Sequence, residues 1–341
     1  MLVHAWLLAT CMLGQTTDRL PERFEFTQIQ MGMPFRIVLY APDEDSANAA
    51  ARAAFAKIKH LNGIMSDYEP ESELMLLCRT AGTGMPVKVS RDLLTVLSRS
   101  LELSKKSDGA FDVTVGPVVK LWRRARKTRT YPDAEELAAA LDLVGFRNIR
   151  IDEPAGTVEL LKKGMQIDLG GIAVGYAIDE VLALLKERGI ASALIDGSGD
   201  IGVSDRPPGK EGWRIGIAPL EADDEPSRYI VLKNAAVTTS GDAFQFVELA
   251  GKRYSHIVDP RTGVGLVDRS SVTVIARNCT IADSYTKAVS VLGPARGFAL
   301  IEEVPGGAAL VVRAADGRRE TFESKRLRNY LVDSIQEKAD D

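Results

Sequence analysis

A globular protein that combines α-helices with short β-strands is the architecture that this sequence predicts. Its 341 residues are 45% hydrophobic and 26% charged, which suits one large domain or two smaller ones. Helical spacing of apolar residues recurs in several segments, and short apolar runs of β type alternate with glycine-containing turns. The net charge of -4 argues against a nucleic-acid-binding surface as the main function.

The N-terminal segment differs from the rest of the chain. Residues 2–13 form an apolar run of signal-peptide length, followed by a polar stretch, although no Lys or Arg precedes the run. Residues 8–11 read Leu-Ala-Thr-Cys and resemble a bacterial lipobox, with an atypical Thr before the Cys. We expect residues 1–20 to be a signal peptide or a lipoprotein leader, with a lipid anchor at Cys11 in the second case. The alternative is a short segment that only resembles a signal.

One motif, Asp168-Leu169-Gly170-Gly171, organises the interpretation of the chain. We predict a short strand before it, at Met165–Asp168, and after it a helix that ends near Arg188. A strand–Gly-Gly–helix junction leaves backbone N–H groups open to an anion, often a phosphate. Asp168 is a candidate acceptor of hydrogen bonds from a ligand. The alternative is a tight turn with no ligand.

The other elements follow in chain order. A basic run at 123–129 is interpreted as a solvated, mobile connection and not as a nucleic-acid site. A helix is predicted to open at Asp43 or Ser46, another spans Arg91 to Lys106 behind the cap Ser90, a third starts at Pro132-Asp133, and a last one is capped by Asn278 or Thr280. Strands are predicted at Phe24–Tyr40 with an interruption near Gly32, and at Ile149–Ile151, Thr157–Leu161, Ala191–Ile195, Trp213–Ile217, Tyr229–Leu232, Ala236–Thr239 and Ser271–Ile275. Residues 238–242 are interpreted as a polar turn.

Two clusters suggest chemistry. His256 precedes Asp259-Pro260 by three residues, which is a plausible base with an orienting carboxylate. Asp283, Thr286 and Lys287 share one face of a predicted helix. A carboxylate and a hydroxyl together suit a hard cation such as Mg²⁺, and the alternative is an Asp–Lys ion pair on a solvated face.

In combination, the motifs resemble those of the ApbE family, the FAD:protein FMN transferases, over roughly Met31 to Gly293. The matching pieces are Met31-Gly32, Ser66-Asp67-Tyr68 with Ser72, Gly109-Ala110-Phe111-Asp112, Asp168-Leu169-Gly170-Gly171-Ile172-Ala173, Ser198-Gly199-Asp200-Ile201, Thr239-Ser240-Gly241, the segment from His256 to Gly263, and Ala282-Asp283 with Leu292-Gly293.

The resemblance implies a fold and an activity. The expected fold is α+β, related to the T-fold, with mixed and antiparallel sheets flanked by helices. A single domain would span residues 24–330, with a polar C-terminal tail at 331–341. The expected activity transfers FMN from FAD to a Thr or Ser hydroxyl of a target protein, with release of AMP and help from a divalent cation, usually Mg²⁺. Family targets include subunits of Nqr- and Rnf-type redox complexes, and family members are typically exported, often as lipoproteins, which implies the periplasmic side.

The resemblance also assigns residues. The implied FAD contacts are Met31, Tyr68, Gly109, Ala110, Phe111, Asp168 and Ile257. The implied metal ligands are the carbonyl of Gly171, Asp283 and the position four residues on, which is Lys287, with Thr286 just before it. His256 is the implied base that takes the proton of the acceptor hydroxyl, and Asp259 is its supporting group.

Three positions depart from the family pattern. Val174 stands where the family has Lys, Lys287 where it has Thr, and Met33 where it usually has Thr. We hypothesise that the Lys287 ammonium lies near the space of the lost lysine at 174 or in that of the metal. A protonated amine is no metal ligand, so Lys287 cannot take the place of the family Thr in holding Mg²⁺. Alternatives to a transferase are an FAD-binding protein and a metal-dependent FAD pyrophosphatase.

Overall fold

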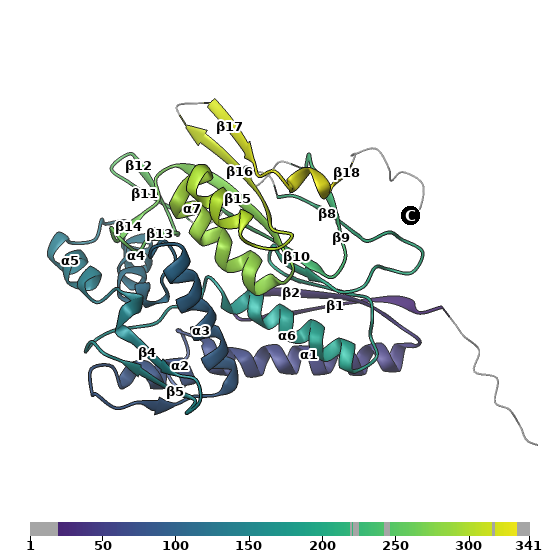
Figure 1. The fold of residues 1–341 in the computed structure, drawn as a ribbon, viewed down its shortest axis with the longest axis horizontal. Helices are drawn as coiled ribbons and strands as arrows, with labels where there is room; N and C mark the ends of the chain where they lie inside the picture. The colour runs from purple at the N-terminus through teal and green to yellow at the C-terminus, as the bar shows by residue number, and fades with distance from the viewer. Residues whose placement is uncertain (1–19, 219, 221–224, 242–245, 316–317, 333–341) are drawn as a thin grey trace, which may run out of the picture.

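The computed structural model describes residues 20–218, 220, 225–241, 246–315 and 318–332 (Figure 1). The helices are α1 (Glu44–Met65), α2 (Glu73–Arg79), α3 (Arg91–Lys106), α4 (Gly116–Thr128), α5 (Ala134–Asp142), α6 (Ala173–Glu187) and α7 (Cys279–Glu302). The strands are β1 (Glu22–Gln30), β2 (Met33–Ala41), β3 (Val87–Lys88), β4 (Ile149–Asp152), β5 (Thr157–Leu160), β6 (Ala193–Gly197), β7 (Asp200–Val203), β8 (Trp213–Gly216), β9 (Tyr229–Leu232), β10 (Ala235–Gly241), β11 (Phe246–Leu249), β12 (Lys252–Ser255), β13 (Val258–Asp259), β14 (Val264–Gly265), β15 (Arg269–Ala276), β16 (Ala308–Ala315), β17 (Arg318–Glu323) and β18 (Leu331–Val332).

An eight-stranded sheet forms the centre of the molecule. Its strand order is β1-β2-β6-β7-β10-β15-β16-β17, and every neighbouring pair in it is antiparallel. Helices and antiparallel sheets together confirm the α+β class. The strand pairings in the described residues are all antiparallel, whereas both mixed and antiparallel sheets were expected.

The central sheet has an apolar core on each face. Because successive strand residues point to opposite faces, Phe35, Ile37 and Leu39 of β2 pack with the helices, whereas Val38 joins the core on the other side. Helices α1, α6 and α7 lie on the first face, and the small sheet β18-β9-β8 covers the second (Figure 1). Two buried faces make this sheet the rigid base against which the helices are positioned.

A third apolar cluster joins α4 and α5 to the hairpins β11–β12 and β13–β14. Trp122 of α4 donates a hydrogen bond from Nε1 to the carbonyl of Gly263 at 2.8 Å and contacts the rings of Tyr131 and Tyr254. In Figure 1 this unit and the sheet β3-β5-β4 lie at one end of α1 and α6. The segments that carry the predicted site residues therefore meet beside the central sheet.

Helix caps behave largely as the sequence predicts. The side chains of Asp43, Ser90, Asp133 and Asn278 each accept a backbone N–H in the first turn of α1, α3, α5 and α7, respectively. Each cap satisfies an N–H that the helix itself leaves unpaired.

Three local predictions are wrong. The basic run at 123–129 is the C-terminal half of α4 and its cap, and it is held by the apolar face that Trp122 and Ala125 bury. Residues 165–168 form no strand, and the Asp168 N–H donates to the Val113 carbonyl instead. The predicted turn at 238–242 is strand β10 as far as Gly241, because β15 pairs with it to Gly241 and β7 pairs with it at Thr238.

The chain ends carry predictions that reach past the described residues. Most of the predicted leader, including Cys11, and residues 333–341 of the predicted tail lie outside them. Leu331 and Val332, where that tail was expected to start, form β18 against β9. Among the described residues, no helix has both the length and the apolar character required to cross a membrane.

Candidate active site

A cavity of about 680 Å³ lies where the helical units meet the edge of the central sheet. Such a volume is within the usual range of small-molecule sites. All the predicted FAD contacts line it except Gly109, together with His256, Gly171 and Lys287. Gly109 does not line the cavity, but its φ of +73° turns the chain after α3 toward Ala110, which does. Segments from the whole length of the chain thus converge on one cavity.

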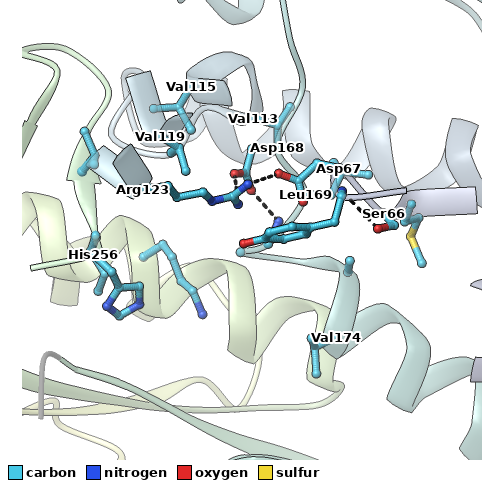
Figure 2. Close-up of a pocket in the computed structure, with 18 of the residues that line it drawn as sticks. Ser66, Asp67, Val113, Val115, Val119, Arg123, Asp168, Leu169, Val174 and His256 are labelled. Carbon is cyan, nitrogen blue, oxygen red and sulfur yellow. Dashed lines mark hydrogen bonds and ion pairs between the residues drawn. The ribbon is translucent and has the colours of Figure 1, made fainter. Parts of the chain in front are cut away.

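Arg123 is the centre of the polar wall of this cavity. Figure 2 shows its guanidinium between two carboxylates, donating through Nη1 to Asp67 Oδ2 and through Nη2 to Asp168 Oδ2, the latter at 2.8 Å. The guanidinium carbon also lies 4.4 Å from the centre of the Tyr68 ring, a cation–π distance. Tyr68 is 71% exposed, so its ring is available to a flat ligand at the cavity mouth.

Asp168 sits in a setting that disfavours its charge. Burial and the nearby charge of Asp67 raise the pKa of Asp168 above its ordinary value, and Arg123 opposes this rise. Its Oδ1 accepts the Gly170 N–H at 2.8 Å. The carboxylate is therefore held in place by Arg123 on one side and by the glycine turn on the other.

The glycine turn is less open than the sequence predicts. The Gly170 N–H donates to Asp168, and the N–H groups of Ile172 and Ala173 both donate to the Leu169 carbonyl. The expected anion cradle at the start of α6 is therefore largely satisfied by the protein itself.

The predicted metal cluster is an ion pair with a buried carboxylate. Lys287 Nζ donates to Asp283 Oδ1 at 2.5 Å, and Asp283 Oδ2 accepts the Gly175 N–H at 3.2 Å. Asp283 has 1% of its side chain exposed, whereas Lys287 is 21% exposed and lines the cavity. Thr286 is buried away from the cavity: its hydroxyl donates to the Asp283 carbonyl at 2.6 Å and lies 2.7 Å from Ser240 Oγ. The pair is thus neither on a solvated face nor arranged around an open ligand position.

Asp200, at the start of β7, belongs to the same charge cluster. Burial and the charge of Asp283 raise the pKa of Asp200 to about 8, while Lys287 opposes this rise. Burial lowers the pKa of Lys287, but the charges of Asp283 and Asp200 outweigh it and the pKa lies above its ordinary value. Lys287 is therefore a stable cation paired with Asp283, and Asp200 lies near enough to influence its charge.

His256 lies in a short, well-fixed loop between β12 and β13. On either side of it, the Ser255 N–H donates to the Leu266 carbonyl at 2.7 Å, and the Leu266 N–H donates to the Ile257 carbonyl at 2.9 Å. In Figure 2, His256 lies apart from the cluster around Arg123. The loop therefore holds the imidazole at the cavity wall.

The Asp259 carboxylate, the predicted supporting group of His256, pairs with Arg261. Its Oδ1 accepts the backbone N–H and Nε of Arg261, both at 2.9 Å, and its Oδ2 accepts Nη2 at 2.8 Å. The carboxylate is thus committed to Arg261, because residue 259 already belongs to β13 and its side chain turns to the hairpin loop. Its neighbours Val258 and Pro260 line the cavity, and Asp259 does not.

Sequence reasoning missed three charged residues of the site. Asp67 and Asp200 stood inside family motifs but received no role, and Arg123 was hidden in a run of basic residues. The apolar spacing of Val118, Trp122 and Ala125 was the available signal, because it places α4 on the core and leaves Arg123 beside it.

Val174 packs into the protein as well as lining the cavity. It is 7% exposed, and its Cγ1 would lie 2.9 Å from a Cβ at Gly197. Its apolar side chain therefore supplies no charge at the position where the family has a lysine.

Comparisons with known proteins identify the family. The model of the ApbE family matches residues 31–312. The FAD:protein FMN transferase of Treponema pallidum (strain Nichols) is 32% identical over 319 residues, which cover 89% of this chain and 88% of that protein. The FAD:protein FMN transferase of Vibrio cholerae (Classical Ogawa 395) is 30% identical, with 96% of this chain and 98% of that protein covered.

Solved structures agree with the sequence comparisons. The flavin transferase ApbE from Vibrio cholerae superposes with a TM-score of 0.82 at 29% identity, over 91% of this chain and 99% of that one. The apo form of the Pseudomonas stutzeri flavinyl transferase ApbE gives a TM-score of 0.80, also at 29% identity, over 92% and 98%. The fold, the cavity and the match over most of the sequence lead to one conclusion: the chain belongs to the ApbE family.

Proposed function

We propose that this protein is an FAD:protein FMN transferase. The observation that carries the proposal is the cavity itself, which gathers an exposed aromatic ring at Tyr68, the carboxylate of Asp168 and the imidazole of His256 in one space. The names of the relatives support FAD as the substrate and a protein as the acceptor.

The proposed reaction is a phosphoryl transfer with His256 as base. The oxygen of an acceptor Thr or Ser hydroxyl forms a bond to the flavin-side phosphorus of FAD. The bond between that phosphorus and the bridging oxygen breaks, and AMP leaves with the electron pair. His256 takes the proton of the hydroxyl, and a base held in a fixed loop is suited to this task. Tyr68 and Phe111 provide apolar surface for the flavin.

The residues present do not fit the divalent cation that the family pattern implies. Both oxygens of Asp283 are engaged, one by Lys287 and one by Gly175, and the hydroxyl of Thr286 points to Ser240. Among the described residues, no three His, Cys, Asp or Glu side chains gather into a group that could hold a metal ion. The proposed reaction is therefore written without a metal step.

An acceptor assay tests the proposal. Purified protein is incubated with FAD and a flavin-acceptor domain of the Nqr or Rnf type, and flavin on the acceptor is read by in-gel fluorescence while AMP is measured in solution. We expect fluorescent acceptor and an equal amount of AMP, and loss of both in His256→Ala. AMP without labelled acceptor would identify a pyrophosphatase, and neither product would leave an FAD-binding protein.

We also propose that the protein is exported and acts on the periplasmic side, with a lipid anchor at Cys11. The apolar run at 2–13 and the cysteine at its end support this proposal. Membrane fractionation of the wild type and of Cys11→Ser tests the anchor: the wild type should sediment with membranes and the variant should not. Equal distribution of both would refute lipidation.

A further inference from the structure

The Lys287 side chain contacts two of the implied metal ligands, Gly171 and Asp283. A Cβ placed on Gly171 would lie 3.3 Å from Lys287 Cγ and 3.6 Å from Lys287 Cε, so the lysine stem passes over Gly171. Its Nζ then reaches Asp283 Oδ1 at 2.5 Å. The side chain thus runs from one implied metal ligand to the other.

The amine cannot share this space with a divalent cation. A protonated lysine has three donors and no lone pair, and it repels a second cation placed against the same carboxylate. Both Asp283 oxygens already accept a hydrogen bond, Oδ1 from Lys287 and Oδ2 from the Gly175 N–H within the first turn of α6. A metal ion would have to displace the ammonium from the carboxylate and leave it unpaired beside a second cation, which is costly.

The same amine faces the cavity in which the diphosphate of FAD would lie. Lys287 lines the cavity, and its side chain is 21% exposed. Asp283 uses one of the three N–H donors, and no second hydrogen bond of Nζ is found to the residues that the structure describes. Further donors are therefore available to an oxyanion.

We propose that Lys287 is a built-in cation that replaces the divalent metal, so that this protein binds and cleaves FAD without one. The proposal rests on FAD being the substrate, as argued above. The ammonium hydrogen-bonds the diphosphate and balances the charge that the departing AMP phosphate gains when the bridging P–O bond breaks. Asp283 then serves as a positioning residue that holds the ammonium at the cavity wall.

The first test measures metal binding directly, without activity. Mn²⁺ is titrated into the purified protein and followed by electron paramagnetic resonance, in which bound Mn²⁺ loses its sharp six-line signal. We expect the wild type to leave the signal unchanged. Lys287→Thr should bind Mn²⁺ roughly tenfold or more tightly than the wild type, because it restores an oxygen ligand and frees the carboxylate. Lys287→Met is the matched control: it removes the charge, adds no ligand and should gain less affinity than Lys287→Thr.

The second test measures FAD. Quenching of flavin fluorescence gives the affinity in the presence of a chelator. We expect the wild type to bind FAD equally well with chelator and with Mg²⁺, and Lys287→Met to lose roughly tenfold or more, as expected for a lost charge-assisted hydrogen bond. Lys106→Met removes a lysine that also pairs at i,i+4, with Glu102, but on an exposed surface, and should leave FAD affinity unchanged.

The outcomes separate this proposal from the transferase proposal. Stoichiometric Mn²⁺ binding by the wild type that Mg²⁺ displaces, or FAD affinity that collapses in chelator, overturns the role of Lys287 even if every variant is unstable. Absence of labelled acceptor with these two results as expected overturns the transferase activity and leaves the built-in cation standing. Acceptor labelling that proceeds in chelator supports both.

Discussion

Arg123 keeps two carboxylates, Asp67 and Asp168, beside each other at the cavity wall. Their side chains are 15% and 10% exposed, and that of Arg123 is 22% exposed, so solvent screens the three charges weakly. Removing one member of such a cluster leaves unpaired charges that water reaches only in part. The arginine is therefore a structural requirement of the site before it has any role toward a ligand.

Arg123→Ala should destabilise the protein by roughly 2–4 kcal/mol at pH 8, somewhat below the cost of breaking a fully buried pair. The loss should shrink toward pH 5, because the pKa of Asp168 is already raised and rises further without Arg123, so protonation relieves the repulsion. Urea unfolding at the two pH values measures both effects.

Arg124→Ala is the matched control on the same helix. Arg124 pairs with Glu136, and both side chains are about half exposed, at 53% and 48%. Such a pair contributes at most about 1 kcal/mol, so the control should change little at either pH. Equal losses in the two variants would show that the cluster around Arg123 carries no special stability.

The raised pKa of Asp200 makes the stability of the folded protein depend on pH. Its pKa rises from 3.8 to about 8 in the folded protein, so the folded state binds a proton that the unfolded state releases. Stability from this group is fully present below pH 3.8 and is lost as the pH rises through 8. Thermal unfolding of Asp200→Asn should show a weaker decline between pH 4 and pH 8 than the wild type. An identical decline would mean that Asp200 is already ionised at low pH.

The sequence was sufficient to predict a side chain's hydrogen-bond partner where the two residues are close along the chain. The caps Asp43, Ser90 and Asn278 bond to N–H groups three residues away, so local pattern predicts them. Arg123 meets Asp67 and Asp168 across 56 and 45 residues, and no local rule reports such a meeting. The strand expected at 165–168 failed for the same reason, because strand formation requires a partner strand.

Helices α6 and α7 cap each other. Asp179 of α6 accepts the N–H groups of Cys279 and Thr280 at the start of α7, and Asp283 of α7 accepts the Gly175 N–H at the start of α6. The exchange requires a very close approach, since a Cβ at Gly175 would lie 2.4 Å from the Cys279 carbonyl oxygen. Gly175 is therefore required for the close packing of α6 against α7.

Gly175→Ala should destabilise the protein by about 1–3 kcal/mol or more, because the added methyl must push α7 away. The same displacement would move Asp283 and weaken FAD binding. Urea unfolding and flavin fluorescence quenching measure the two losses.

Gly63→Ala provides the comparison of opposite sign. Gly63 lies in α1, and a Cβ there would meet no atom within 4 Å. Alanine at that position should stabilise the helix by roughly 0.5–1 kcal/mol. Stabilisation by both substitutions would contradict the close contact between α6 and α7.

The part of the chain that the structure describes has three apolar cores, and we predict that they unfold together as the single domain expected for residues 24–330. Trp213 belongs to the core under the small sheet, and Trp122 to the cluster around α4. In a Trp6→Phe background, Trp122→Phe keeps only Trp213 and Trp213→Phe keeps only Trp122, so the fluorescence of each variant follows one core. The two urea transitions should have the same midpoint, after correction for each variant's stability measured by circular dichroism. Separate midpoints would divide the chain into two units.

The cavity brings together residues that are far apart in the sequence, since both Met31 and Lys287 line it. A chain emerging from the ribosome can close the β1–β2 hairpin early, since its contacts are local. The nucleotide site cannot form before α7, which is synthesised after the other segments that line the cavity, and contacts this distant in sequence form slowly. Flavin uptake would accordingly report that the last stage of folding is complete. A chain that a premature stop codon ends anywhere before α7 would take up no flavin.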